Sequence, residues 1–111
     1  MWTVDSTTIE HIARDRVGFM EYHRIPIGSR DIKVGNGASV EVLGIGTYKL
    51  ELRGGHTLLL HDVLYAPKIR RNLLSVVTLL RFGSSLFLRI IMFYCIWEQF
   101  IMAVVLFQMV F

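Results

Sequence analysis

Cysteine is nearly absent from this chain, whose 111 residues contain only Cys95. A lone cysteine cannot form an internal disulfide, and it gives no Cys/His spacing of the kind that binds zinc. The N-terminus also lacks the basic and then apolar pattern of a signal peptide. We therefore expect an intracellular protein with neither a disulfide framework nor a zinc site.

Concentrated positive charge and phosphate-binding loops are also missing. The net charge is +3, and the only cluster of cations is Lys68, Arg70 and Arg71. Nucleic-acid binding needs a larger basic surface, so this cluster is typical of a solvated loop. The glycine-rich stretches 35–37 and 44–46 lack a following helix with nucleotide-binding spacing. The sequence predicts no cofactor and no specific nucleic-acid partner.

Apolar residues make up 53% of the chain, and they are unevenly distributed. Residues 84–111 are almost purely apolar, interrupted chiefly by Arg89 and Glu98. Residues 1–83 contain every glycine and nearly all the charged residues. This change divides the chain into a domain over residues 1–83 and a hydrophobic tail over residues 84–111.

Short strands separated by glycine turns are predicted within the domain. Segments 31–34 and 39–44 alternate and flank an Asn-Gly turn, which suits a tight hairpin. Segment 47–53 also alternates, whereas 56–65 is a more continuous apolar run, typical of a strand covered on both faces. The glycines at 44–46 suggest a bulge. Together these strands predict an all-β fold, a small barrel.

The apolar spacing changes after Pro67, from strand-like to helical. It predicts one short helix over 72–83, with Asn72 as its N-terminal cap and Gly83 at its end. The residues that define its apolar face are Leu73, Val76, Val77 and Leu80. This helix would close one side of the barrel.

Several short motifs occur in a distinctive order. They are W-x-V-D-S near the start, a His a few residues later, V-G-N-G, G-I-G, and D-V-L-Y-A-P-K-I-R-R-N-L-L-S-V over residues 62–76. In this order they resemble the β-barrel, protease-region domain of copia-type (TNT-like) retrotransposon Pol polyproteins, over roughly residues 2–83. The resemblance implies a retropepsin-like fold, related to aspartic proteases that work as homodimers with one Asp from each subunit.

The resemblance makes Asp5 the candidate catalytic residue and Ser6 a supporting one. An aspartic protease activates water between two carboxylates, which share a proton because both cannot ionise at close range. One chain is too short for two such lobes, so a homodimer would have to bring two copies of Asp5 together. The substrate would then be a Gag-Pol polyprotein.

The turn departs from the pattern of the family, which is D-[ST]-G-[AC]-[ST] followed shortly by His. Thr7, Thr8 and Ile9 occupy the last three positions of the turn, while His11 keeps its place. A β-branched residue is stiff where a glycine conformation is required. We therefore expect Thr7 to strain the turn by about 1–3 kcal/mol.

Three functions follow from this comparison. We expect an inactive remnant of a Gag-Pol aspartic protease domain, in which Asp5 accepts backbone hydrogen bonds at a strand end. One alternative is an active dimeric aspartic endopeptidase that processes Gag-Pol. The other is a non-catalytic β-domain that is tethered to a membrane or binds a protein partner.

The remaining histidines indicate no metal site. His11 has no cysteine or carboxylate at ligand spacing, so it is expected to be structural or solvated. His56 and His61 alternate with apolar residues of one strand.

The tail departs from the resembled family, which continues with a segment like Y-G-S-G-x-x-x-N-G-F. The last ten residues can be encoded so that a one-nucleotide shift reads Y-G-S-G-F-I-S-N-G-F, which predicts an out-of-frame tail. Alternatively, residues 86–108 could span a bilayer, which takes about 20 residues. The remaining interpretations are an apolar helix that lies on the barrel and an aggregation-prone end. We expect the tail to be helical.

Overall fold

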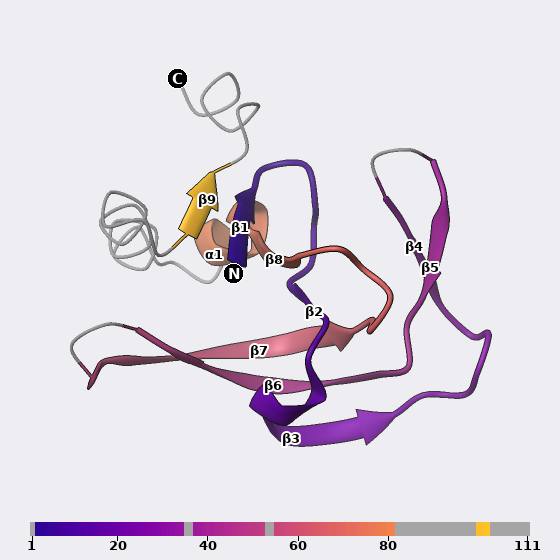
Figure 1. The fold of residues 1–111 in the computed structure, drawn as a ribbon, viewed down its shortest axis with the longest axis horizontal. Helices are drawn as coiled ribbons and strands as arrows, with labels where there is room; N and C mark the ends of the chain where they lie inside the picture. The colour runs from indigo at the N-terminus through magenta and orange to yellow at the C-terminus, as the bar shows by residue number, and fades with distance from the viewer. Residues whose placement is uncertain (1, 35–36, 53–54, 82–99, 103–111) are drawn as a thin grey trace. The chain divides into compact units, whose positions relative to one another are not determined.

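The computed structural model describes residues 2–34, 37–52, 55–81 and 100–102. These residues fall into two compact units (Figure 1). The central unit is Ile12–Arg70, and the terminal unit joins Met1–His11 to Arg71–Phe111.

The central unit is built on a sheet of four strands. Its elements are β2 (Ile12–Ala13), the 3-10 helix η1 (Arg16–Gly18), β3 (Phe19–Arg24), β4 (Asp31–Lys33), β5 (Ser39–Glu41), β6 (Gly44–Glu51) and β7 (Thr57–Tyr65). The strand order is β3-β6-β7-β2, antiparallel except for the parallel pair β7 and β2. Strands β4 and β5 form a separate antiparallel ribbon, which confirms the hairpin predicted from the Asn-Gly turn.

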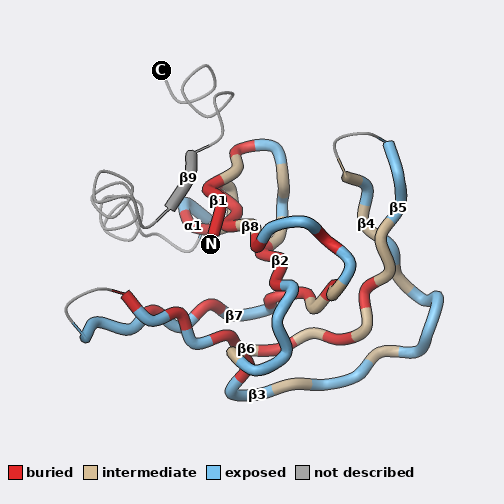
Figure 2. Tube along the Cα trace, viewed as in Figure 1, coloured by how far each residue is buried: buried red, intermediate tan, exposed pale blue. Residues whose placement is uncertain are grey.

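Strand β6 follows the predicted alternation, because Tyr48 and Leu50 are buried while Lys49 and Glu51 are exposed (Figure 2). Strand β7 also alternates over its first half, and Leu59 is 47% exposed. The prediction that this strand is covered on both faces was therefore wrong. The run of three leucines suggested it, but the middle leucine faces solvent.

A β-bulge interrupts the pairing of β6 with β7. Gly46 pairs with Val63 and Tyr48 pairs with Leu60, so Thr47 alone opposes two residues, His61 and Asp62. Asp62 has φ +55°, and no other described residue except glycine has a positive φ. The bulge lies one residue beyond the glycines that predicted it.

Aromatic rings pack edge-to-face on the central unit. Phe19 lies 5.4 Å from Tyr22, 5.1 Å from Tyr48 and 5.8 Å from Tyr65, measured between ring centroids. Gly44 faces this cluster, and a Cβ built there would overlap the ring of Tyr22. The glycine therefore makes room for an aromatic ring over the neighbouring strand.

The terminal unit contains a three-stranded parallel sheet and the one α-helix of the described chain. Its elements are β1 (Trp2–Asp5), β8 (Asn72–Ser75), α1 (Val76–Arg81) and β9 (Phe100–Met102). β1 lies between β8 and β9 and is parallel to both. Asp5 is the register partner of Ser75, so the last residues of β1 and β8 lie side by side.

The helix is shorter than its apolar spacing predicted. Residues Asn72–Ser75 pair with β1 as a strand, and α1 begins only at Val76. The capping side chain is Ser75 rather than Asn72, because the Ser75 Oγ accepts the N–H of Thr78 at 3.1 Å. The predicted end at Gly83 lies outside the described residues. The predicted fold class, mostly β with one short helix, is confirmed.

The predicted helical tail lies largely outside the described residues. Its described portion, Phe100–Met102, is a strand and not a helix. Within the described chain, no helix has the length and apolar character needed to cross a membrane.

The bulge generates a prediction about stability. Asp62→Val should lower the free energy of unfolding by about 1–2 kcal/mol, because a β-branched residue is disfavoured in the left-handed region. Asp62→Gly should change it by less than about 0.5 kcal/mol, since glycine adopts this conformation freely.

Urea unfolding would measure both Asp62 variants, with Leu59→Val as the control at an exposed position of the same strand. Equal stabilities for Asp62→Val and Asp62→Gly would contradict the assigned backbone conformation.

Candidate functional site

Buried polar side chains gather in the terminal unit. Within the described chain, every polar residue that is buried belongs to this unit: Thr3, Ser6, His11, Asn72 and Ser75. They lie on β1, on the turn that follows it, and on β8. Buried polar groups are costly unless they are hydrogen-bonded, so this concentration marks the turn after β1 as the candidate site.

Asp5 is half-buried at the end of β1, and its carboxylate closes the turn. Its Oδ1 accepts the N–H of Thr7 at 2.7 Å and the hydroxyl of Thr7 at 2.6 Å. Thr7 does not have a positive φ. The prediction that Thr7 strains the turn was therefore wrong, because the turn does not require a glycine conformation at this position.

Ser6 is only 5% exposed, and its Oγ has no hydrogen-bond partner within the described chain. The Oγ1 of Thr3 is in the same situation. An unpaired buried hydroxyl costs roughly 1–3 kcal/mol. Within the described chain, the Ser6 hydroxyl makes no hydrogen bond to the Asp5 carboxylate.

His11 is buried, at 3% exposure, and holds a backbone group of β8. Its Nδ1 accepts the N–H of Ser75 at 3.0 Å. The ring must therefore be neutral with its proton on Nε2. Burial lowers the pKa of His11 to about 4.

Ser75 and Thr78 tie the turn to the start of α1. The Ser75 hydroxyl donates to the carbonyl of Thr8 at 2.7 Å, and the Thr78 hydroxyl donates to the carbonyl of Ile9 at 2.7 Å. With His11, these bonds fix the turn to β8 and α1 at three points. Local sequence patterns do not reveal Ser75 and Thr78 as part of this site, because their partners Thr8 and Ile9 are more than sixty residues away in the sequence.

This arrangement is not a nucleophile triad. Ser75 is fully buried, and its hydroxyl is directed to Thr8 rather than to His11. His11 receives the backbone N–H of Ser75 instead. Within the described chain, no three His, Cys, Asp or Glu side chains are grouped so that they could hold a metal ion.

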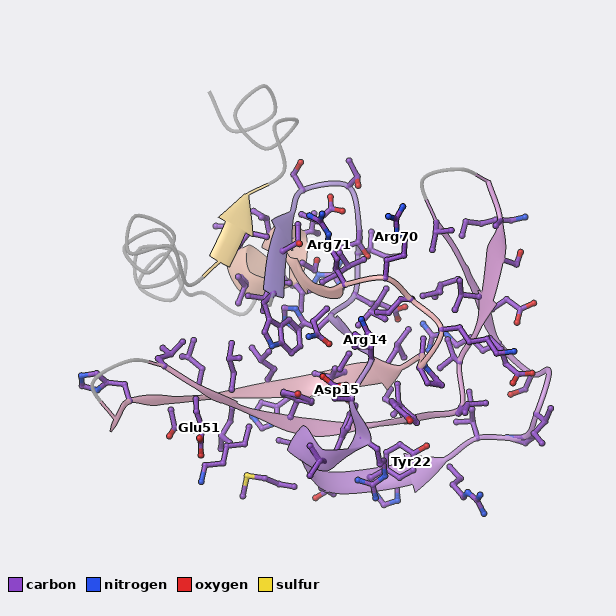
Figure 3. All side chains as sticks on the ribbon, in the orientation of Figure 1. Arg14, Asp15, Tyr22, Glu51, Arg70 and Arg71 are labelled. Atoms are coloured by element: carbon purple, nitrogen blue, oxygen red, sulfur yellow. The ribbon has the colours of Figure 1, made fainter. Side chains whose placement is uncertain are left out.

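The other candidate residues lie in exposed positions of the central unit. His56 and His61 are exposed, and the His61 Nδ1 lies 3.4 Å from the Thr47 Oγ1. Lys68 and Arg70 are also exposed, and the Arg14 Nη1 donates to the carbonyl of Arg70 at 3.1 Å (Figure 3).

The chain is thus mostly β, with an Asp-led turn braced by a buried histidine, and comparison with known proteins identifies its family. The family described as "Pol polyprotein, beta-barrel domain" matches residues 2–84. The chain belongs to this family.

Curated relatives are retrotransposon proteins. The chain is 34% identical over 82 residues to "Retrovirus-related Pol polyprotein from transposon TNT 1-94" of Nicotiana tabacum, which covers 74% of this chain and 6% of that protein. It is 32% identical over 78 residues to "Retrovirus-related Pol polyprotein from transposon RE1" of Arabidopsis thaliana, covering 70% of this chain and 5% of that protein. The resemblance to copia-type Pol polyproteins is confirmed.

A yeast relative is shorter. A putative transposon Ty5-1 protein of Saccharomyces cerevisiae is 33% identical over 75 residues, covering 68% of this chain and 47% of that protein. The chain thus spans a small part of the plant polyproteins and about half of the yeast protein. No solved structure matches.

The buried His11 predicts an acid-sensitive fold. Between pH 6.5 and about 4, the unfolded chain protonates this histidine while the folded chain does not. The stability that comes from a neutral, buried His11 is therefore fully present above pH 6.5, and it is lost as the pH falls toward 4. At about 1.4 kcal/mol per pH unit, this acidification should lower the free energy of unfolding by up to about 3 kcal/mol.

Urea unfolding at several pH values would measure this effect. His11→Gln should remove this part of the pH dependence, because glutamine does not titrate. His23→Gln is the matched control, since His23 is an exposed residue on β3. An unchanged pH dependence in His11→Gln would show that the histidine is not the group responsible.

Proposed function

We propose that this chain is a non-catalytic remnant of the protease-region domain of a copia-type Pol polyprotein. The observation that carries the proposal is the 2.6 Å hydrogen bond between the Thr7 hydroxyl and the Asp5 Oδ1. An aspartic protease activates one water between two carboxylates that share a proton. In this turn the Thr7 hydroxyl adds a second bond to the Oδ1 that its N–H already reaches, and the family's glycine has no side chain to make such a bond.

A homodimer would double this obstacle. Two copies of Asp5 would each bring a Thr7 side chain to the shared centre, where catalysis tolerates displacements of less than about 1 Å. Ile9 also stands where the family has a hydroxyl, and its side chain is 66% exposed. It can donate no hydrogen bond from its side chain to a second copy of the turn.

One observation favours the alternative of an active dimeric aspartic endopeptidase. The Thr7 N–H donates to the Asp5 Oδ1 at 2.7 Å, which is the backbone contact expected of the glycine in the family's turn. The backbone of the turn therefore suits a catalytic Asp, and the side chains of Thr7 and its neighbours are the departures. Substitutions at these positions separate the two functions.

If the chain is inactive, it should not behave as a protease in a cleavage assay. Purified wild-type chain should cleave a Gag-Pol junction peptide no faster than Asp5→Asn, which removes the carboxylate at nearly constant shape. Pepstatin should not change either rate. Pepstatin-sensitive turnover at least tenfold above that of Asp5→Asn would establish the dimeric endopeptidase instead.

Restoring the family's residues in the turn tests whether Thr7, Thr8 and Ile9 prevent catalysis. The triple variant Thr7→Gly, Thr8→Ala, Ile9→Ser restores the family's pattern, and it should show pepstatin-sensitive cleavage if these side chains are the main obstacle. Thr7→Val is the matched control, because it removes the hydroxyl but keeps the branched shape. Adding Asp5→Asn to the triple variant must abolish any activity gained.

If the triple variant folds and dimerises but remains inactive, the loss of function extends beyond the turn. Analytical ultracentrifugation of wild type and variant would establish the oligomeric state in parallel. The repaired turn should favour dimers, because serine at position 9 restores a donor that the exposed Ile9 side chain lacks.

A further inference from the structure

The apolar tail returns to the strand that carries Asp5. Strand β9 pairs in parallel with β1, with Trp2 opposite Phe100, Thr3 opposite Ile101 and Val4 opposite Met102. The other edge of β1 is paired with β8. The tail therefore covers the edge of β1 that β8 leaves open.

The burial of β1 requires such a partner. Trp2 and Val4 are 7% and 0% exposed, and Thr3, which alternates with them, is 9% exposed. Successive residues of a strand face opposite sides, so both faces of β1 are covered. A strand buried on both faces cannot leave backbone N–H and C=O groups unpaired along one edge without a large cost.

The composition of the tail suits an edge-pairing strand. From Phe100 onward, the sequence F-I-M-A-V-V-L-F contains no charged residue and several β-branched and aromatic ones. Such residues favour strands. No charged residue follows Glu98, so nothing in this segment opposes burial beside β1.

We propose that the outer edge of β1 is the docking site of the chain's own tail, and that this docking excludes insertion of the tail into a membrane. A membrane span takes about 20 residues. Any span of that length within residues 86–111 must include residues 92–105, and therefore Phe100–Met102. These three residues cannot both pair with β1 as a strand and cross a bilayer as part of a helix.

Cysteine cross-linking tests the docking. In a Cys95→Ser chain, Thr3→Cys and Ile101→Cys place thiols on register partners. Adjacent strands lie about 4.8 Å apart, within the Cα range of a disulfide. The control pair, Thr3→Cys with Val105→Cys, places the second thiol four residues after the register partner in the sequence.

Mild oxidation should cross-link the Thr3/Ile101 pair at least tenfold faster than the control pair, and within one chain. Mixing chains with tags of different mass distinguishes internal from intermolecular bonds. Equal rates for the two pairs would overturn the proposal. Bonds formed only between chains would also overturn it, and would assign the edge to the tail of a second copy.

Phosphatidylcholine vesicles test the exclusion. Cross-linked chain should be released from the vesicles by carbonate at pH 11, because its tail is held on β1. Retention of the cross-linked chain in the carbonate-washed vesicles would overturn the exclusion.

Hydrogen exchange tests the same edge without cysteines. Ile101→Pro removes a donor from β9 and should speed the exchange of β1 amides about tenfold, whereas Leu106→Pro should not. Unchanged exchange in Ile101→Pro would also overturn the docking.

Discussion

The hydrogen bonds of one buried residue, Ser75, connect the separate parts of the terminal unit. Its N–H reaches His11, and its hydroxyl bonds both the carbonyl of Thr8 and the N–H of Thr78. The end of β8, the start of α1 and the turn after β1 therefore share a single fully buried side chain. Because each partner is itself backbone or buried, loss of this residue would leave several polar groups unpaired at once.

The turn that holds Asp5 is thus maintained by interactions that have no need of catalysis. His11 is neutral and serves as an acceptor, and Thr7 satisfies the Asp5 carboxylate from within the same turn. Selection for a stable fold is enough to retain such contacts, with or without an activity. The sequence motif accordingly identifies the family more directly than it identifies an enzyme.

Much of the fold could be predicted from local patterns, and the failures have physical causes. Alternation identified β6, and the Asn-Gly turn identified the β4–β5 ribbon. The helix start was misplaced because Asn72–Ser75 gains more from pairing with a distant strand than from helical spacing. In the site, Asp5 and His11 were found by motif. The role of Ser75 could not be found, since its partners Thr8 and His11 lie more than sixty residues away in the sequence.

The division of the chain has a consequence for how the protein folds. The terminal unit is assembled from both ends of the sequence, with Ile12–Arg70 between them. During synthesis, β1 is made long before β8, the strand from Asn72 onward with which it pairs. Long-range pairing of this kind folds slowly. Until β8 has been made, the Asp5 strand has two open edges, and unpaired strand edges favour aggregation during folding.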